Sequence, residues 1–213
     1  MSTLKKKRNS LRNIPRRRMS KEIFDSILQS SMLMINELGF DKLTTNKVAE
    51  LAGVSIGSLY RYFPNRDAIL FNLIKEFINV NHAFFINSLV SQKGKDMKTT
   101  ITFMIETSLA HFLKKPKFFI LLHQKMYETE AREIIFEARR SLSITFVDTI
   151  HDTFPNWNIE PKRDVLLEKV NQSIHSYMSA LFAVLLENPS EETLSILKGG
   201  MVQLFILSIQ KEH

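Results

Sequence analysis

The chain has 213 residues with a net charge of +7; 44% are hydrophobic and 24% charged, enough to bury a substantial core in one or two domains. It contains no cysteine, which excludes disulfides, thiolate metal sites and cysteine nucleophiles. No signal-peptide pattern follows the basic N-terminus, and the longest uncharged stretch, residues 171–186, is too short to span a bilayer, so we expect a soluble, cytoplasmic protein with no membrane partner.

The basic excess lies in the first third of the chain. Residues 1–66 contain 13 Lys and Arg but only 5 Asp and Glu, a net charge of +8, whereas residues 67–213 have a net charge of −1. This asymmetry is typical of a protein that binds a polyanion, most often nucleic acid or an anionic membrane surface. Residues 1–19 are predicted to form a disordered basic arm along DNA; the alternative is a solubilising tail.

Three short helices are predicted in residues 20–66. The first begins at Ser20 and ends at Gly39, a natural C-terminal stop. The second starts near Thr44, which can cap it, and ends at Gly53. The third is capped by Ser55 and ends before Pro64, which removes a backbone donor. Two short helices joined by a glycine turn predict a helix-turn-helix whose third helix is the recognition helix.

The exposed face of the third helix has the chemistry of a DNA contact. Leu59 and Phe63, four residues apart, are predicted to anchor the helix, which turns Gly57, Tyr60 and Arg61 outward. Gly57 lets the backbone approach a groove closely, and an arginine can pair bidentately with guanine or bind a phosphate. The alternative is a small helical dimerisation module with an exposed aromatic patch.

Residues 67–213 are predicted to be entirely helical. One long helix covers 67–90, and further helices are expected near 97–114, 116–129, 130–153, 162–187 and 191–210. The six histidines have no spacing suited to a metal, and neither a phosphate-binding glycine loop nor a nucleophile elbow is present. We therefore expect an all-α chain that is not an enzyme and holds no metal or cofactor.

Residues 39–70, GFDKLTTNKVAELAGVSIGSLYRYFPNRDAIL, resemble the N-terminal DNA-binding domain of the TetR family of bacterial transcriptional regulators. The resemblance lies in the Gly-Phe pair that ends the first helix, the Thr-Thr that opens the second, Ala-Gly-Val-Ser at the turn, and Gly-x-Leu-Tyr-x-Tyr-Phe. It covers residues 20–75 in detail, and the remainder only in helical character. It implies a helix-turn-helix domain at 20–66 and a helical ligand-binding and dimerisation domain at 67–213.

The resemblance also implies which residues contact double-stranded DNA. Phosphate contacts are expected from Thr45, Ser55, Tyr60, Tyr62 and Arg66, and base or groove contacts from Ile56, Gly57, Ser58 and Arg61. Thr44 and Lys47 complete the expected surface. Many family members have a basic or polar residue at the position of Ile56, so contact with a thymine methyl group is the more natural expectation there.

The C-terminal helices predict a homodimer. Residues 162–187 and 191–210 are apolar nearly all round, which predicts burial of both faces in a four-helix interface between two copies. A two-fold dimer requires a palindromic operator. Gly199 and Gly200, inside the last helix, are expected to permit close helix crossing.

The resemblance implies that the helices of the body surround a central cavity, and their aromatic and methionine residues suit a small apolar effector that releases the protein, a repressor, from its operator. The expected wall residues are Phe103, Phe112, Phe119, His123, Met126, Tyr127, Phe146, Met178 and Phe182. A dry packed core of the same residues is the alternative. In a second hypothesis for function, the domain binds DNA but the helical body docks a protein partner and has no effector.

Overall fold

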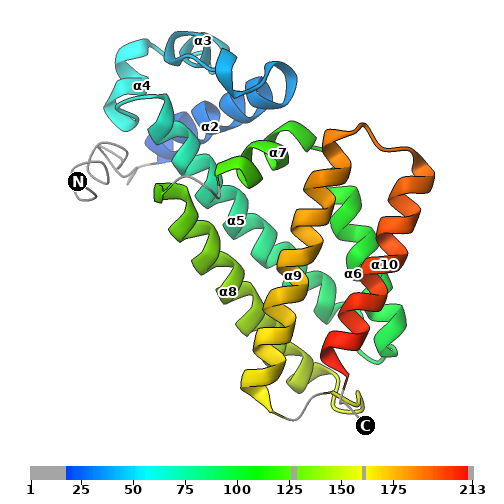
Figure 1. Ribbon diagram of the computed structural model, residues 1–213. Coiled ribbons are helices and arrows are strands. Elements are labelled where there is room, and N and C mark those ends of the chain that lie inside the picture. The colour runs from blue at the N-terminus through cyan, green and yellow to red at the C-terminus, as the bar shows by residue number, and fades with distance from the viewer. Residues whose placement is uncertain (1–17, 126–128, 160–161, 211–213) are drawn as a thin grey trace.

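The computed structural model describes residues 18–125, 129–159 and 162–210, and it confirms the all-α prediction (Figure 1). The N-terminal helices are α2 (Arg18–Leu38), the 3-10 turn η1 (Phe40–Lys42), α3 (Thr45–Leu51) and α4 (Ile56–Tyr62). The body contains α5 (Arg66–Val90), α6 (Met97–Phe112), α7 (Pro116–Lys125), α8 (Thr129–Thr153), α9 (Arg163–Leu186) and α10 (Glu191–Ile209). Most of the predicted basic arm lies outside the described residues.

The N-terminal helices begin and end at the capping residues and glycines that the sequence predicts. Gly39 has a φ of 85° and Gly53 a φ of 65°, left-handed conformations that glycine adopts at low cost after a helix. The Thr44 side chain accepts a hydrogen bond from Lys47 N, and the Ser55 side chain accepts one from Ser58 N. The predicted N-terminal caps of α3 and α4 are therefore confirmed.

The N-terminal unit, residues 18–66, packs around the third helix. Leu59 and Phe63 are fully buried, and the Phe63 ring stacks on Phe24 of α2 at a centroid distance of 4.9 Å. Ser26 of α2 donates a hydrogen bond to the carbonyl of Ala52 in the glycine turn. These contacts hold α3 and α4 at fixed positions on α2, so the outer face of α4 is presented rigidly.

Two hydrophobic cores run through the molecule and meet in the body. The first contains the buried residues of the N-terminal unit together with Phe118, Leu121 and Leu122 of α7. The second fills the space between α6, α8, α9 and α10. Phe77 of α5 packs against both cores, at 5.1 Å from Phe118 and 6.1 Å from Phe112 between ring centroids. The N-terminal unit and the body are therefore packed as one continuous structure.

Helix α7 also bonds directly to α2. Phe118 N donates to Asn36 Oδ1 at 3.2 Å, and Lys117 Nζ donates to the carbonyl of Glu37 at 2.6 Å, a contact at the exposed end of α2. The Glu37 carbonyl and the Asn36 side chain lie in the last turn of α2. Both thus accept hydrogen bonds from a segment that lies, for Glu37, 80 residues later in the chain. The first turn of α7 is thus the second connection, besides α5, between the body and the N-terminal unit.

By length and composition alone, α5 and α10 are apolar enough to cross a membrane. For α5, packing within the chain gives another explanation. α5 passes between α2, α6 and α8 through the middle of the molecule, and α10 lies against α6 and α9 (Figure 1). The apolar residues of α5 are needed for two cores at once, which accounts for its composition.

Truncating Phe118 should destabilise the whole molecule. Phe118→Ala removes a fully buried ring between the cores, and we expect a loss of ~3–5 kcal/mol in the free energy of unfolding. Phe103→Ala, at a half-exposed ring on α6, is the matched control and should cost much less. Urea unfolding followed by far-UV circular dichroism and by fluorescence of Trp157 should give coincident single transitions; two separate transitions would contradict one continuous core.

Candidate DNA-binding surface and internal cavity

The outer face of α4 is exposed and has no acidic residue. Ile56, Gly57, Tyr60 and Arg61 all lie on the surface, and Glu50 is the only acid between Asp41 and Asp67. Within the chain, a Cβ added at Gly57 would meet only Ser55 Oγ at 3.9 Å, an ordinary contact. Packing within the chain does not require glycine at position 57. The missing side chain instead suits close approach by a molecule from outside the chain.

A hydrogen bond joins the start of α3 to α4 across this surface. Thr45 Oγ1 lies 3.1 Å from the Tyr60 hydroxyl. Two residues expected to contact phosphate are thereby held together. The Ser55 and Ser58 hydroxyls are also paired, at 2.9 Å.

Two of the predicted basic contacts are positioned by aromatic rings. The Arg66 guanidinium lies 4.8 Å from the centre of the Phe40 ring, and it also pairs with the exposed Asp67 at 3.8 Å. The Arg61 Nη2 donates to the Tyr62 hydroxyl at 2.9 Å. Lys47, on the other side of the helix pair, is exposed.

Tyr62 differs from the expectation of a flat exposed contact. Tyr62 is only 2% exposed, because its ring packs edge-on to the Phe24 ring inside the N-terminal unit. Its hydroxyl accepts the hydrogen bond from Arg61, so the structural role of this residue is to hold Arg61. The periodicity that placed Leu59 in the core also places Tyr62 there, three residues later.

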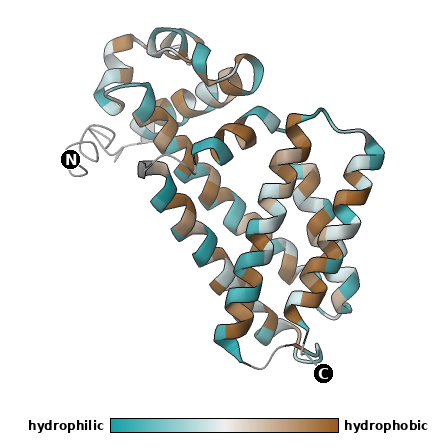
Figure 2. Cartoon of the chain, in the orientation of Figure 1, coloured by the Kyte–Doolittle hydropathy of each residue, from teal (hydrophilic) through white to brown (hydrophobic). Residues whose placement is uncertain are grey.

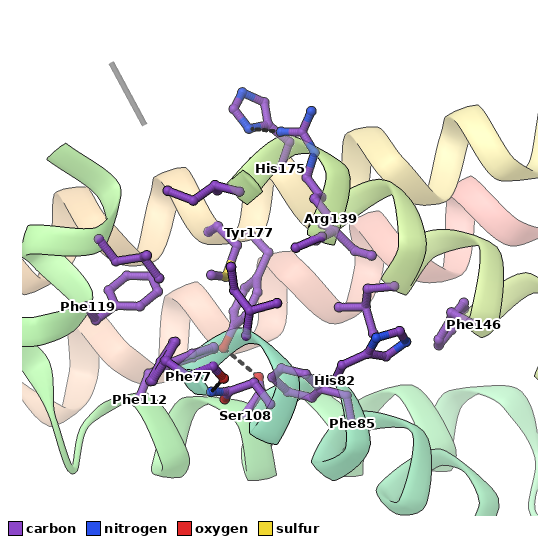
Figure 3. Close-up of a pocket in the computed structure, with 18 of the residues that line it drawn as sticks. Phe77, His82, Phe85, Ser108, Phe112, Phe119, Arg139, Phe146, His175 and Tyr177 are labelled. Atoms are coloured by element: carbon purple, nitrogen blue, oxygen red, sulfur yellow. Dashed lines mark hydrogen bonds between the residues drawn. The ribbon is translucent and has the colours of Figure 1, made fainter. Parts of the chain in front are cut away.

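The second candidate site is a cavity of about 170 Å³ inside the body, between α5, α6, α7, α8 and α9 (Figure 3). Its wall is mainly aromatic and aliphatic. Five of the predicted ligand residues line it: Phe112, Phe119, His123, Phe146 and Met178. Met126 and Tyr127 lie outside the described residues.

Two predicted wall residues lie elsewhere. Phe103 is 36% exposed, and its neighbour Met104 lines the cavity instead, since adjacent helical residues point about 100° apart. Phe182 lies behind the wall, where its ring stacks on His123 at a centroid distance of 4.0 Å. It therefore orients a lining residue without lining the cavity.

Apart from His123, the polar groups of the cavity and the whole contribution of α5 were not predicted from the sequence. From α5 come Phe77, Asn81, His82 and Phe85; from the other helices come Ser108, Tyr177, Arg139 and His175. A signal for some of them was present, because Asn81 and Ser108 interrupt apolar faces that are otherwise suited to burial. Arg139 donates to Asn171 Oδ1 at 3.1 Å and lies 2.7 Å from His175 Nδ1. Figure 3 shows Arg139 and His175 together at one edge of the cavity.

Burial disfavours the charged form of two histidines of the cavity, His123 and His175. Desolvation lowers the pKa of His123, and nearby His175 lowers it further. The pKa of His175 is lowered by its burial and by Arg139. Neutral His175 can then accept a hydrogen bond from Arg139 through Nδ1. Among the residues that the structure describes, no group of His, Asp or Glu side chains is arranged to hold a metal ion.

Comparison with known proteins relates the N-terminal unit to a described family. Residues 27–73 match the sequence profile of the TetR_N domain, described as bacterial regulatory proteins, tetR family. Nucleoid occlusion factor SlmA of Glaesserella parasuis is 30% identical over 100 residues, which are 46% of this chain and 48% of that protein. The chain thus spans about half the length of this curated relative.

Solved structures share the fold over nearly the whole chain. A TetR-family transcriptional regulator from Mesorhizobium loti superposes with a TM-score of 0.74 at 10% identity, covering 92% of this chain and all of that one. Thermus thermophilus FadR, a TetR-family repressor solved in complex with lauroyl-CoA, gives a TM-score of 0.64 at 13% identity, covering 89% and 96%. At these identities the likeness is one of fold.

Lowering the pH should destabilise the folded protein. Because folding lowers the pKa of His123 and His175, the unfolded chain binds more protons than the folded chain as the pH falls through the ordinary histidine range, so stability declines from pH 7.5 to pH 5.5. We expect the melting temperature to fall over this interval, and to fall less steeply in His123→Gln. His151→Gln, at an exposed histidine near the end of α8, should retain the wild-type slope.

Proposed function

Because the chain belongs to the TetR family of bacterial regulatory proteins, we propose that it is a homodimeric transcriptional regulator that binds a specific DNA sequence in the cytoplasm. The observation that carries this proposal is the outer face of α4, exposed, free of acid and held rigidly by the core beneath it. Base contacts come from Ile56, Gly57, Ser58 and Arg61. Phosphate contacts come from Thr44, Thr45, Lys47, Ser55, Tyr60 and Arg66.

Tyr62 supports Arg61 in this proposal. Before DNA binds, Arg61 donates to the Tyr62 hydroxyl, which keeps the guanidinium beside the α4 surface. An arginine held near its target loses less side-chain freedom on binding than a free one. A guanine would then replace or share the contact with the tyrosine.

We propose that α9 and α10 form the dimer interface. Leu186 is 55% exposed, Ile196 69% and Leu207 61% in the single chain. The outer face of α10 also contains Gly199 and Gly200, and no atom of the described chain lies within 4 Å of a Cβ added to either. Figure 2 shows apolar residues along most of α10 and along the C-terminal half of α9. From residue 196 to residue 207 this face has no charged residue, and with its two exposed glycines it suits close packing against a second copy.

The cavity supports an effector that releases the DNA. α5 begins directly after the turn that follows α4, and about three to four turns later it reaches the cavity wall at Phe77 and Asn81. α7 also has one face in the N-terminal core, at Phe118, and another on the cavity, at Phe119. An occupant that shifts α5 or α7 would move both α4 helices of the dimer relative to successive major grooves. A coupling of ~1–3 kcal/mol would weaken operator binding ~5–150-fold.

A second candidate is a DNA-binding protein whose body docks a protein partner. The observation that favours it is the similarity to a curated protein named for nucleoid occlusion and not for response to a small molecule. The two candidates differ in what the cavity does. An apolar molecule that occupies the cavity and changes DNA affinity supports the first; DNA affinity indifferent to every cavity occupant supports the second.

DNA recovered by selection from random duplexes should distinguish base contacts from phosphate contacts. Arg61→Ala should cost ~1–3 kcal/mol on the selected site and relax the preference at one base pair. Arg66→Gln should weaken binding to all sequences alike and reduce the slope of log affinity against log salt by about one. The matched control is Lys93→Gln, an exposed cation in the turn that follows α5. Failure to enrich any sequence would refute specific recognition.

The dimer proposal predicts that charge on the outer face of α10 separates the subunits. Ile196→Glu with Leu207→Glu should convert a dimer to a monomer in sedimentation velocity at micromolar concentration, because two carboxylates would be buried in an apolar interface. Val80→Glu replaces a side chain that is 52% exposed on α5 and should leave the dimer intact. A wild-type monomer at that concentration would show that α9 and α10 do not dimerise.

A further inference from the structure

An unpaired acceptor lies in the wall of the cavity. Asn81 of α5 is only 6% exposed. Its Nδ2 donates to the carbonyl of Phe77 at 2.5 Å, which fixes the orientation of the amide, since the flipped amide would place two oxygens against each other. Its Oδ1 has no hydrogen-bond partner within the described part of the chain. Buried acceptors of this kind are normally satisfied, so this oxygen points to a donor from outside the chain.

A second acceptor lies in the same wall. Ser108 Oγ donates its single proton to the carbonyl of Ile105 at 3.0 Å, so in its 2.6 Å contact with the Tyr177 hydroxyl the tyrosine is the donor (Figure 3). Burial raises the pKa of Tyr177 to about 12, and the phenol keeps this proton. The lone pairs of the Tyr177 oxygen remain available. The interior of the cavity therefore offers hydrogen-bond acceptors in a mainly apolar wall.

The size of the cavity limits what it can hold. An engineered apolar cavity of about 150 Å³ is known to bind benzene, and this cavity has about 170 Å³. Phe77, Phe85, Phe112 and Phe119 provide flat walls for one ring. A single substituted ring is therefore of a suitable size for this space.

We propose that the effector is a neutral, single-ring molecule with one hydroxyl group, such as an alkylphenol, which donates a hydrogen bond to Asn81 Oδ1. This inference rests on the proposed effector-responsive function and names the chemical class of the effector. The competing class is a ring with a carboxylate, which would bind to Arg139 at the edge of the cavity. Arg139 already donates to Asn171, faces His175 and lies 4.7 Å from the Phe136 ring centre, whereas Asn81 Oδ1 has no such partner.

Three probes of nearly equal size test the proposal by calorimetric titration of the full chain without DNA. They are 4-ethylphenol, its methyl ether 4-ethylanisole, and 4-ethylbenzoate. We expect the phenol to bind about tenfold or more tightly than the ether, because only the phenol can donate to the buried oxygen. The benzoate should bind more weakly than the phenol.

Variants show whether Asn81 causes the preference. Asn81→Leu should bring the phenol-to-ether ratio close to one, and Tyr177→Phe tests the second acceptor in a variant with an unchanged Asn81. The matched control is Asn72→Leu, since Asn72 is also buried on α5 and also donates to the carbonyl four residues earlier, but lies away from the cavity wall. Asn72→Leu should retain the wild-type ratio.

Each contrary outcome overturns the proposal in a distinct way. Equal binding of the phenol and the ether removes the role of Asn81, tighter binding of the benzoate assigns the site to Arg139, and no binding of any probe shows a dry core. Selection of DNA by the same protein tests the regulator function separately. DNA binding with no probe bound would overturn the effector class alone, whereas probe binding without DNA binding would overturn the regulator function alone.

Discussion

The packing of Phe77 between Phe112 and Phe118 is the contact on which the rest of the structure depends. One ring belongs to the core under the helix-turn-helix and to the core of the body, so neither core can be rearranged without the other. Because interiors are close-packed, a displacement of one ring is passed to its neighbours instead of being absorbed. The same ring also lines the cavity, which places the proposed effector against the joint between the two cores.

The boundaries of the helices could be predicted from the sequence because they are set locally. Thr44, Ser55 and the glycines at the helix ends act on their own turn of backbone, and such signals are present in the sequence itself. The resemblance over residues 39–70 supplied the expected DNA contacts, and the structure leaves all of them but Tyr62 on or near the surface. The burial of Tyr62 follows from the position of Phe24, which belongs to a different helix.

The composition of the cavity wall could be predicted only in part, for a physical reason. An aromatic residue on an amphipathic helix packs inward, but which cavity or core it meets depends on the rotation of that helix against its neighbours. For this reason Phe103 is partly exposed while its neighbour Met104 lines the cavity. α5 contributes to the wall because it crosses the molecule diagonally (Figure 1). Asn81 and Ser108 are the exceptions: polar residues on a buried face mark a place where packing alone does not explain the side chain.

The two glycines of α10 affect how the folding of the regulator depends on its concentration. Glycine inside a helix is destabilising by roughly 0.5–1 kcal/mol relative to alanine, and the single chain gains no contact at Gly199 or Gly200 in return. If the second subunit supplies that contact, part of the order of α10 is obtained by association, so folding and dimerisation are linked by mass action. Occupancy of a palindromic operator would then rise more steeply than the number of chains in the cell, and a regulator present in few copies would switch within a narrow range of its own abundance.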